Sequence, residues 1–378
     1  MKIARALLPK ILSDLKTGSK GVVIYGPRQV GKTTLVNDAL DLLGVKSLIL
    51  NGDERGTWWE WFTSREHAKI NQLVSGYEVV FIDEAQRIPE VGLSLKILLD
   101  SFPQKKVIVT GSSSLDLASK ISEPLTGRVN TYKLFSISQG ELSATQTPLE
   151  LATNIEERLI YGSYPEIFSI DSKEKRTNYL RNLTNAYLYK DLLDFGNIRN
   201  SNKIYDLLKL LAFQVGSQVS TTELATSLEL SRDTVTKYID LLEKSFVIFR
   251  LSGFSRNLRK EVTKMDKIYF YDLGVRNAII GNLHPLADRD DVGKLWENFL
   301  VVERIKRQAY AGILSAPYFW RLNTGAELDF VEDAGGSLSG FEFKYTKKNT
   351  KQPMSWSQTY PQSTFELINT DNWLDFVI

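Results

Sequence analysis

Residues 20–40 read KGVVIYGPRQVGKTTLVNDAL, and this stretch decides the fold of the first part of the chain. Residues 22–25 are apolar and β-prone, and Gly26 and Gly31-Lys32-Thr33 follow with the spacing of a phosphate-binding P-loop. A helical pattern then runs through Leu35. Because a P-loop needs this order of strand, loop and helix, the sequence predicts a phosphate site at the amino terminus of a helix.

Each residue type in this loop has a chemical reason to be there. The two glycines allow a tight turn and expose backbone N–H groups to phosphate. Lys32 is expected to reach the β- and γ-phosphates of ATP, and the Thr33 hydroxyl is expected to bind Mg²⁺. The predicted nucleotide-binding residues are Gly26, Pro27, Arg28, Gln29, Val30, Gly31, Lys32, Thr33 and Thr34.

A second strand with acidic residues at its end lies in EVVFIDEAQRIP, residues 78–89. Its continuous apolar run is typical of a parallel sheet buried on both faces. At its end Asp83 is expected to hold Mg²⁺ through water, and Glu84 to polarise the attacking water. The alternative is an acidic pair that only caps a core strand.

Residues 105–117, KKVIVTGSSSLDL, predict a further strand with a polar tip. We expect this strand to lie between the other two and Ser112 to orient the lytic water.

Composition bounds the rest of the chain. Its 378 residues suffice for two or three domains, and the composition of 43% hydrophobic and 24% charged residues is that of a globular protein. Residues 1–20 lack the continuous apolar region of a signal peptide, and no apolar run reaches membrane-span length, so we expect a cytoplasmic protein with no membrane partner. The absence of cysteine excludes disulfides and thiol catalysis, and two histidines make a histidine metal site improbable.

The middle of the chain predicts three helices, at about 203–215, 220–228 and from 232 onward, followed by a strand at 247–251. This is the order of a winged helix, whose third helix would offer DNA four residues near its start: Arg232, Asp233, Thr236 and Lys237. With a net charge of only +2, phosphate contacts need a local basic patch. The candidates are Arg256, Arg259, Lys260, Lys264 and Lys267, and Lys347, Lys348 and Lys351 would extend the surface. The alternative is a protein–protein module.

The last part predicts a helix over 291–308 and β-rich runs at 318–322, 328–331 and 340–345. Strand residues two apart share a face, so Glu342 and Lys344 should point together. Asp329 and Glu342, with Glu297 from the helix, would give Mg²⁺ or Mn²⁺ oxygen ligands, and Lys344 would position the attacking water. The alternative is an ordinary surface hairpin.

Eight segments occur in an order that resembles a family of prokaryotic AAA-type ATPases of the AAA+ superfamily: YGPRQVGKTTL, LNGDE, FIDEAQRIP, VTGSSS, LTGRVNTYKLFSIS, YGSYPE, YLYKDL and KIYFYDLGVRNAI. The resemblance implies an oligomer, with a hexamer expected, and maps an arginine that would contact the γ-phosphate in cis or in trans onto Arg128. The alternative for Arg128 is a salt bridge at a helix end. The last part is similar to the PD-(D/E)xK nuclease fold.

The expected fold is therefore α/β, with a P-loop parallel-sheet AAA-type domain at 1–145 and a helical lid at 146–200. A winged helix follows at 201–285, and an α/β restriction-endonuclease-like domain at 286–378. The expected function is ATP hydrolysis coupled to binding and processing of DNA, including branched DNA. One alternative is a remodelling factor that binds DNA or a protein partner without cutting, and another is a transcription regulator.

Overall fold

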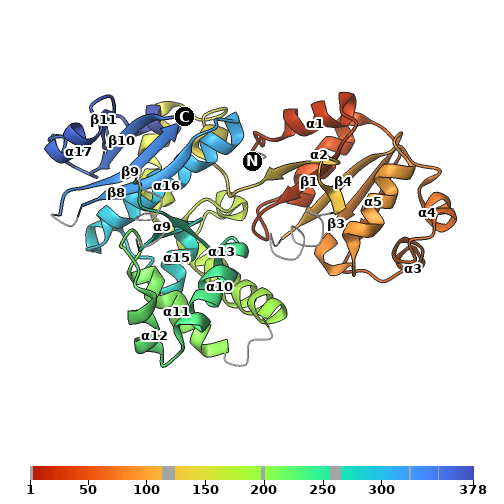
Figure 1. Ribbon diagram of the computed structural model, residues 1–378, viewed down its shortest axis with the longest axis horizontal. Coiled ribbons are helices and arrows are strands. Elements are labelled where there is room, and N and C mark those ends of the chain that lie inside the picture. The colour runs from red at the N-terminus through yellow and green to blue at the C-terminus, as the bar shows by residue number, and fades with distance from the viewer. Residues whose placement is uncertain (1–2, 113–123, 197–200, 256–264, 323–324, 348) are drawn as a thin grey trace. The chain divides into compact units, whose positions relative to one another are not determined.

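The computed structural model describes residues 3–112, 124–196, 201–255, 265–322, 325–347 and 349–378 (Figure 1). The chain forms two compact units. The N-terminal unit contains Ala4–Phe135 and Lys244–Phe246, and the C-terminal unit is built from Ser136–Glu243 and Val247–Ile378. The finer division into four domains stays a prediction.

A five-stranded parallel sheet forms the centre of the N-terminal unit. Its order is β2-β3-β4-β1-β5, so the strand that ends before Ser112 lies between the other two, as the sequence predicts. Every residue of β1 and β3 is buried, which explains their unbroken apolar runs. The strands are β1 (Gly21–Tyr25), β2 (Ser47–Asn51), β3 (Val79–Asp83), β4 (Lys106–Gly111) and β5 (Val129–Lys133).

Helices pack around this sheet (Figure 1). A loop of residues 26–31 joins β1 to the next helix, and Gly31 at the start of that helix lies in the left-handed region with φ of 90°. The helices are α1 (Leu8–Thr17), α2 (Lys32–Leu43), α3 (Thr57–Thr63), α4 (His67–Val74), η1 (Ala85–Arg87) and α5 (Val91–Ser101).

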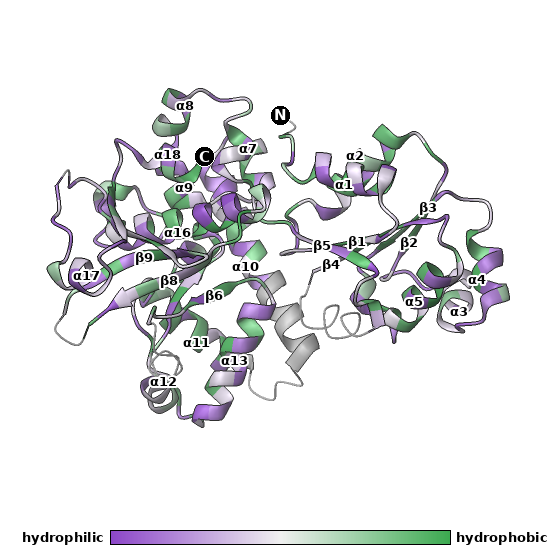
Figure 2. Ribbon diagram, turned by 45° about the horizontal axis from the view of Figure 1, so that its top comes forward, coloured by the Kyte–Doolittle hydropathy of each residue, from purple (hydrophilic) through white to green (hydrophobic). Residues whose placement is uncertain are grey.

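The first half of the C-terminal unit is helical and ends in a two-stranded antiparallel hairpin of β6 and β7. The three helices and the strand predicted between residues 203 and 251 are present. Ser220 caps α12 by accepting a hydrogen bond from Glu223 N. Helix α13 buries one apolar face, and hydrophilic residues lie on its other face (Figure 2). The buried residues of α13 are Val235, Ile239, Leu241 and Leu242. The elements are α7 (Gln139–Leu142), α8 (Pro148–Thr153), α9 (Ile155–Tyr161), η2 (Pro165–Ser169), α10 (Lys173–Gly196), α11 (Ser201–Phe213), α12 (Thr221–Leu228), α13 (Arg232–Lys244), β6 (Ile248–Leu251), β7 (Lys267–Phe270) and α15 (Leu273–Ile279).

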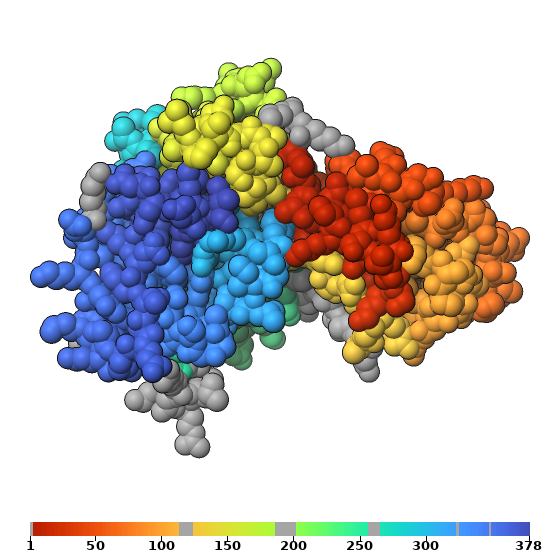
Figure 3. Space-filling model, turned by 90° about the horizontal axis from the view of Figure 1, so that it is seen from above, coloured from red at the N-terminus to blue at the C-terminus, as the bar shows by residue number. Residues whose placement is uncertain are grey.

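The second half contains a small sheet of order β11-β10-β9-β8, in which only β10 and β11 run parallel. The C-terminal end of the chain lies beside α8 and α9 in the space-filling view (Figure 3), and Leu151 and Ile378 line one cavity. The elements are η3 (Leu286–Asp288), α16 (Val292–Ala311), β8 (Ala316–Arg321), β9 (Glu327–Ala334), β10 (Ser337–Phe343), α17 (Met354–Thr359), β11 (Thr364–Ile368) and α18 (Trp373–Val377).

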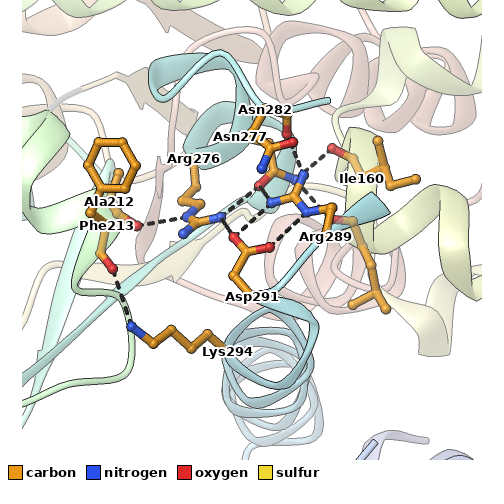
Figure 4. Close-up of polar contacts among 10 residues, drawn as sticks. Ile160, Ala212, Phe213, Arg276, Asn277, Asn282, Arg289, Asp291 and Lys294 are labelled. Carbon is orange, nitrogen blue, oxygen red and sulfur yellow. Dashed lines mark hydrogen bonds and ion pairs between the residues drawn. The ribbon is translucent and has the colours of Figure 1, made fainter. Parts of the chain in front are cut away.

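A buried polar cluster ties the segments of the C-terminal unit together (Figure 4). Asp291, just before α16, accepts hydrogen bonds from Arg276 of α15 and from Arg289. Arg276 also donates to Ala212 O of α11 at 2.8 Å, and Asn277 donates to the carbonyls of α9. Helices from the predicted lid, winged helix and nuclease-like segments therefore share one hydrogen-bonded cluster.

Candidate functional site

The phosphate loop lies between β1 and α2, and its two glycines are required by its geometry. A Cβ on Gly26 would lie 2.1 Å from Leu134 O, and Gly31 has φ of 90°, which other residues rarely adopt. Val30 is fully buried and anchors the loop, while Thr33 and Thr34 are exposed on the first turn of α2. The loop therefore presents the amino terminus of α2 to solvent, where an anion is favoured.

Lys32 is buried beneath this loop although it carries a charge, with 5% of its surface exposed. Its ammonium group donates to Gly26 O at 3.0 Å and to Pro27 O at 2.8 Å. These carbonyls hold the ammonium group of Lys32 in the turn. When nucleotide binds, the ammonium group can donate to a phosphate oxygen in their place.

Arg5 supports the loop from below, and the sequence pattern did not identify it. Its guanidinium donates to Val30 O and to Phe135 O, both at 2.6 Å, and only 8% of its surface is exposed. An arginine far from any motif carries no sequence signal for such a role, because both acceptors are backbone carbonyls.

The two predicted Mg²⁺-binding residues meet at the carboxyl edge of the sheet. Thr33 Oγ1 donates to Asp83 Oδ2 at 2.7 Å, and the buried hydroxyl of Thr110 donates to the other oxygen of Asp83. A hydroxyl and a carboxylate in contact are the oxygen donors that Mg²⁺ takes in a nucleotide site, so the donor set fits the ion. Thr110 was not predicted, since it lies one residue inside β4.

Glu84 follows Asp83 in a left-handed conformation with φ of 48°, which turns its side chain away from the sheet core. Gln86 Nε2 donates to Glu84 Oε2 at 2.5 Å and to Ser112 Oγ at 2.9 Å. The amide of Gln86 thus connects the predicted general base to the predicted sensor residue. Gln86 itself was missed, although it stands in the quoted motif, because only its side-chain geometry reveals the bridge.

Arg128 does not join this group in its own subunit. It forms an exposed ion pair with Asp100 at the end of α5, with Nε and Oδ1 2.6 Å apart. Its carbonyl accepts from Gly21 N at the start of β1, so it lies at the opposite end of a strand about 13 Å long from the phosphate loop. A contact in cis with the γ-phosphate is therefore wrong for this conformation, and a contact in trans stays a prediction.

The residues predicted for a nuclease-like site lie in the C-terminal unit. Glu297 of α16 accepts from Lys267 Nζ at 2.9 Å and from Tyr269 OH at 2.6 Å, and Lys267 Nζ is 3.8 Å from Asp329 Oδ1. On the next strand Lys344 Nζ is 2.6 Å from Glu342 Oε1, so these two side chains do share a face.

The expected set of three metal-binding carboxylates is not formed. The described residues include no group of three or more His, Cys, Asp or Glu side chains placed to hold a metal ion. Glu297 and Glu342 each have a lysine as partner, and Asp329 Oδ2 accepts from Phe343 N at 2.8 Å. The carboxylates therefore do not converge on a common metal position.

Burial sets the protonation of this cluster. Burial raises the pKa of Glu297 to about 7, with Lys267 opposing the change and Asp329 adding to it. Burial and the neighbouring Asp329 likewise raise the pKa of Glu342. Burial alone would lower the pKa of Lys267, but the charges of Glu297 and Asp329 outweigh the effect of burial, and the pKa of Lys267 is raised. Lys267 therefore stays an ammonium ion inside the protein.

The residues predicted to face DNA are partly exposed. On α13, Arg232, Asp233 and Lys237 are exposed and Thr236 is half-buried, while Lys347 and Lys351 are exposed near the chain's end. Lys267 was wrongly assigned to the phosphate-binding patch, because it is 4% exposed and paired with Glu297. The remaining predicted cations, Arg256, Arg259, Lys260, Lys264 and Lys348, lie outside the described residues.

Three segments of the chain match known domain families. Residues 18–143 match an AAA domain. Residues 152–285 match a domain of unknown function, DUF8612, and residues 292–363 match another, DUF4143. The uncharacterized protein Rv2008c of Mycobacterium tuberculosis is 30% identical over 333 residues, which cover 86% of this chain and 70% of that protein. The chain belongs to this family of AAA-domain proteins.

The chain is also similar to archaeal proteins. The uncharacterized protein MJ1544 of Methanocaldococcus jannaschii is 24% identical to this AAA-domain protein over 327 residues, which cover 82% of this chain and 71% of that protein. The Walker-type ATPase PABY2304 of Pyrococcus abyssi is similar in structure, with a TM-score of 0.51 at 15% identity. The match covers 74% of this chain and 96% of that one. The fold of the AAA-domain protein is that of P-loop ATPases, a class that uses ATP and Mg²⁺.

The structure also bears on membrane insertion. Among the residues it describes, no helix of this AAA-domain protein combines the length and apolar character needed to span a bilayer.

Proposed function

We propose that this AAA-domain protein hydrolyses ATP and binds DNA through its C-terminal unit, and that nucleotide state controls DNA binding. The observation that carries the ATPase activity is the contact of Thr33 with Asp83, beside the bridge that Gln86 makes between Glu84 and Ser112. Lys32 and the loop N–H groups would bind the phosphates, and Thr33 and Asp83 would hold Mg²⁺, which neutralises phosphate charge. Glu84 would take the proton of the attacking water.

The proposed DNA surface is the exposed start of α13. Support comes from the order of three helices and a hairpin, which is that of a winged helix, and from the exposure of Arg232 and Lys237. A groove of about 500 Å³ adjoins this surface. It is lined in part by Thr221, Thr222, Arg232, Thr236, Arg250 and Asp266. The hydroxyls and the guanidinium group of Arg232 suit phosphate oxygens, whereas Arg250 is paired with Asp240 and Glu243.

Cleavage of DNA is not part of the proposal, because the lysine pairing of Glu297 and Glu342 disfavours a metal-dependent nuclease site. A factor that binds DNA without cutting it, with Arg128 completing a neighbouring subunit's ATP site in a hexamer, agrees best with this geometry. The exposure of Arg128 supports the last point, because an exposed ion pair exchanges partners at little cost.

The test measures ATP hydrolysis with and without linear and four-way-junction DNA, and follows the DNA for cuts with Mg²⁺ and Mn²⁺. We expect stimulation by DNA without cleavage. The double variant Arg232→Ala/Lys237→Ala should weaken DNA binding. It should also make the slope of log K against log salt concentration less steep, by on the order of one for each phosphate contact that is lost. The matched control is Lys173→Ala/Lys175→Ala at the exposed start of α10. If DNA leaves the ATPase rate unchanged and no DNA binding is detected at low salt, the proposed DNA binding is refuted, and the alternative that the C-terminal unit binds a protein partner remains.

A further inference from the structure

The carboxylates of Glu297, Asp329 and Glu342 come from α16, β9 and β10 and meet two lysines of this same chain. Lys267 reaches them from the hairpin strand β7, and its ammonium lies between Glu297 and Asp329. Lys344 lies on the far side and pairs with Glu342. Each acid that a nuclease would use for a metal ion thus has a cation of the protein beside it.

Two further donors of the protein bind these carboxylates. Tyr269 OH donates to the same oxygen of Glu297 that Lys267 binds, and Phe343 N donates to Asp329 Oδ2. Gly216 lies against the carboxylate of Glu297, where even a Cβ would come within 3.2 Å of Oε2. Little room is left on that side for a hydrated ion.

Electrostatics argues the same way. A buried lysine is stable only when paired, and Lys267 is 4% exposed. A divalent cation entering this cluster would be repelled by two ammonium groups. It would also have to displace Lys267, whose Nζ lies over the ring of Phe319 at 5.6 Å in a cation–π contact.

We infer that Lys267 and Lys344 take the place of the divalent metal ion in this carboxylate cluster, and that the cluster is a structural contact between elements of the C-terminal unit. It fastens the β6–β7 hairpin to α16 and the C-terminal sheet. A second link lies beside it, where Phe254 N, just after β6, donates to Phe319 O of β8 at 2.6 Å. The cluster therefore positions the β6–β7 hairpin that follows the proposed DNA-binding helix α13, and it performs no metal chemistry.

The experiment follows Mn²⁺ binding to the full-length, nucleotide-free protein by electron paramagnetic resonance, together with thermal unfolding. Wild type, Asp329→Asn and Glu342→Gln should bind the same amount of Mn²⁺, and Mn²⁺ should leave the Tm of wild type unchanged. Loss of a wild-type Mn²⁺ site in Asp329→Asn or Glu342→Gln would overturn the inference.

A second variant tests the replacement directly. Lys267→Met keeps the length of the side chain but leaves two carboxylates without their cation. It should lower Tm, and Mn²⁺ should raise the Tm of this variant in a concentration-dependent way. The control Lys347→Met removes an exposed lysine and should change neither quantity. A Tm of Lys267→Met equal to that of wild type would overturn the structural role of the cluster. If this variant does not fold, the wild-type Mn²⁺ measurement still decides whether the cluster holds a metal.

Discussion

The hydroxyl of Thr33 donates a 2.7 Å hydrogen bond to the carboxylate of Asp83 and so joins the first turn of α2 to the end of β3. Thr33→Ala removes a predicted Mg²⁺ ligand while leaving the buried core intact. We expect Mg²⁺-dependent ATP hydrolysis to fall by ~10- to 100-fold. Thr33→Ser, which keeps the hydroxyl, should retain most of the activity. Equal rates for Thr33→Ala and Thr33→Ser would contradict the metal role.

The side-chain amide of Gln86 donates one hydrogen bond to Glu84 and a second to Ser112, and so positions Glu84. Gln86→Ala frees the Glu84 carboxylate, so kcat should fall by about 10-fold while the Kd for ATP stays the same, because the amide acts through Glu84 and Ser112. The matched control is Gln72→Ala, an exposed glutamine on α4. Parallel loss of ATP binding in Gln86→Ala would show a structural role instead.

Arg128 and Asp100 form an exposed pair, and such pairs contribute little to stability. Arg128→Ala should therefore leave Tm nearly unchanged. If Arg128 acts on a neighbouring subunit, the variant should lose ATPase activity, and mixing it with the inactive variant Glu84→Gln should restore part of the rate, because mixed oligomers contain intact sites. Wild-type activity for Arg128→Ala alone would remove Arg128 from the site, and a lack of activity in every mixture of two inactive variants would contradict an action in trans.

Asp291 provides a pH test. Burial would raise its pKa, but hydrogen bonds from Arg289 and Arg276 lower it from 3.8 to about 2. The unfolded state thus binds the proton more readily, so this contribution to stability is present above pH 3.8 and is lost as pH falls toward 2. Asp291→Asn should lower the free energy of unfolding by about 3–5 kcal/mol at neutral pH, since it leaves two buried arginines uncompensated.

The measurement is urea unfolding of wild type and Asp291→Asn from pH 7 down to pH 2. The difference between them should shrink as the pH falls through the window set by the two pKa values. Asp290→Asn, at the exposed neighbouring position, is the control and should resemble wild type throughout. A difference that is independent of pH would contradict the charge-based explanation.

Sequence patterns predicted the strands and helices of both units well, because apolar periodicity reports burial directly. They also predicted that Asp83 and Ser112 lie at one edge of the sheet, since parallel strands end together. The sequence did not predict three side chains whose contacts with the site depend on the tertiary structure. They are Thr110, Gln86 and Arg5.

Lys267 shows why the second site was misread. In the sequence it stands at the end of a run rich in lysine and arginine, where a cation is usually solvated. The fold instead brings β7 against α16 and β9, and a partner 30 residues away neutralises the lysine. Long-range pairing of this kind depends on tertiary structure, so residue type and local order predict the carboxylates and Lys344 of this cluster but not Lys267, which pairs with Glu297.

The central claim is that the phosphate loop and Glu84 form an ATP-hydrolysing site. The most direct test compares ATP hydrolysis and ATP binding in wild type and Glu84→Gln. We predict that the variant binds ATP with wild-type affinity but hydrolyses it ~100- to 10,000-fold more slowly, because it keeps the phosphate and Mg²⁺ contacts and lacks the base. ATP hydrolysis at the wild-type rate by Glu84→Gln would contradict the account.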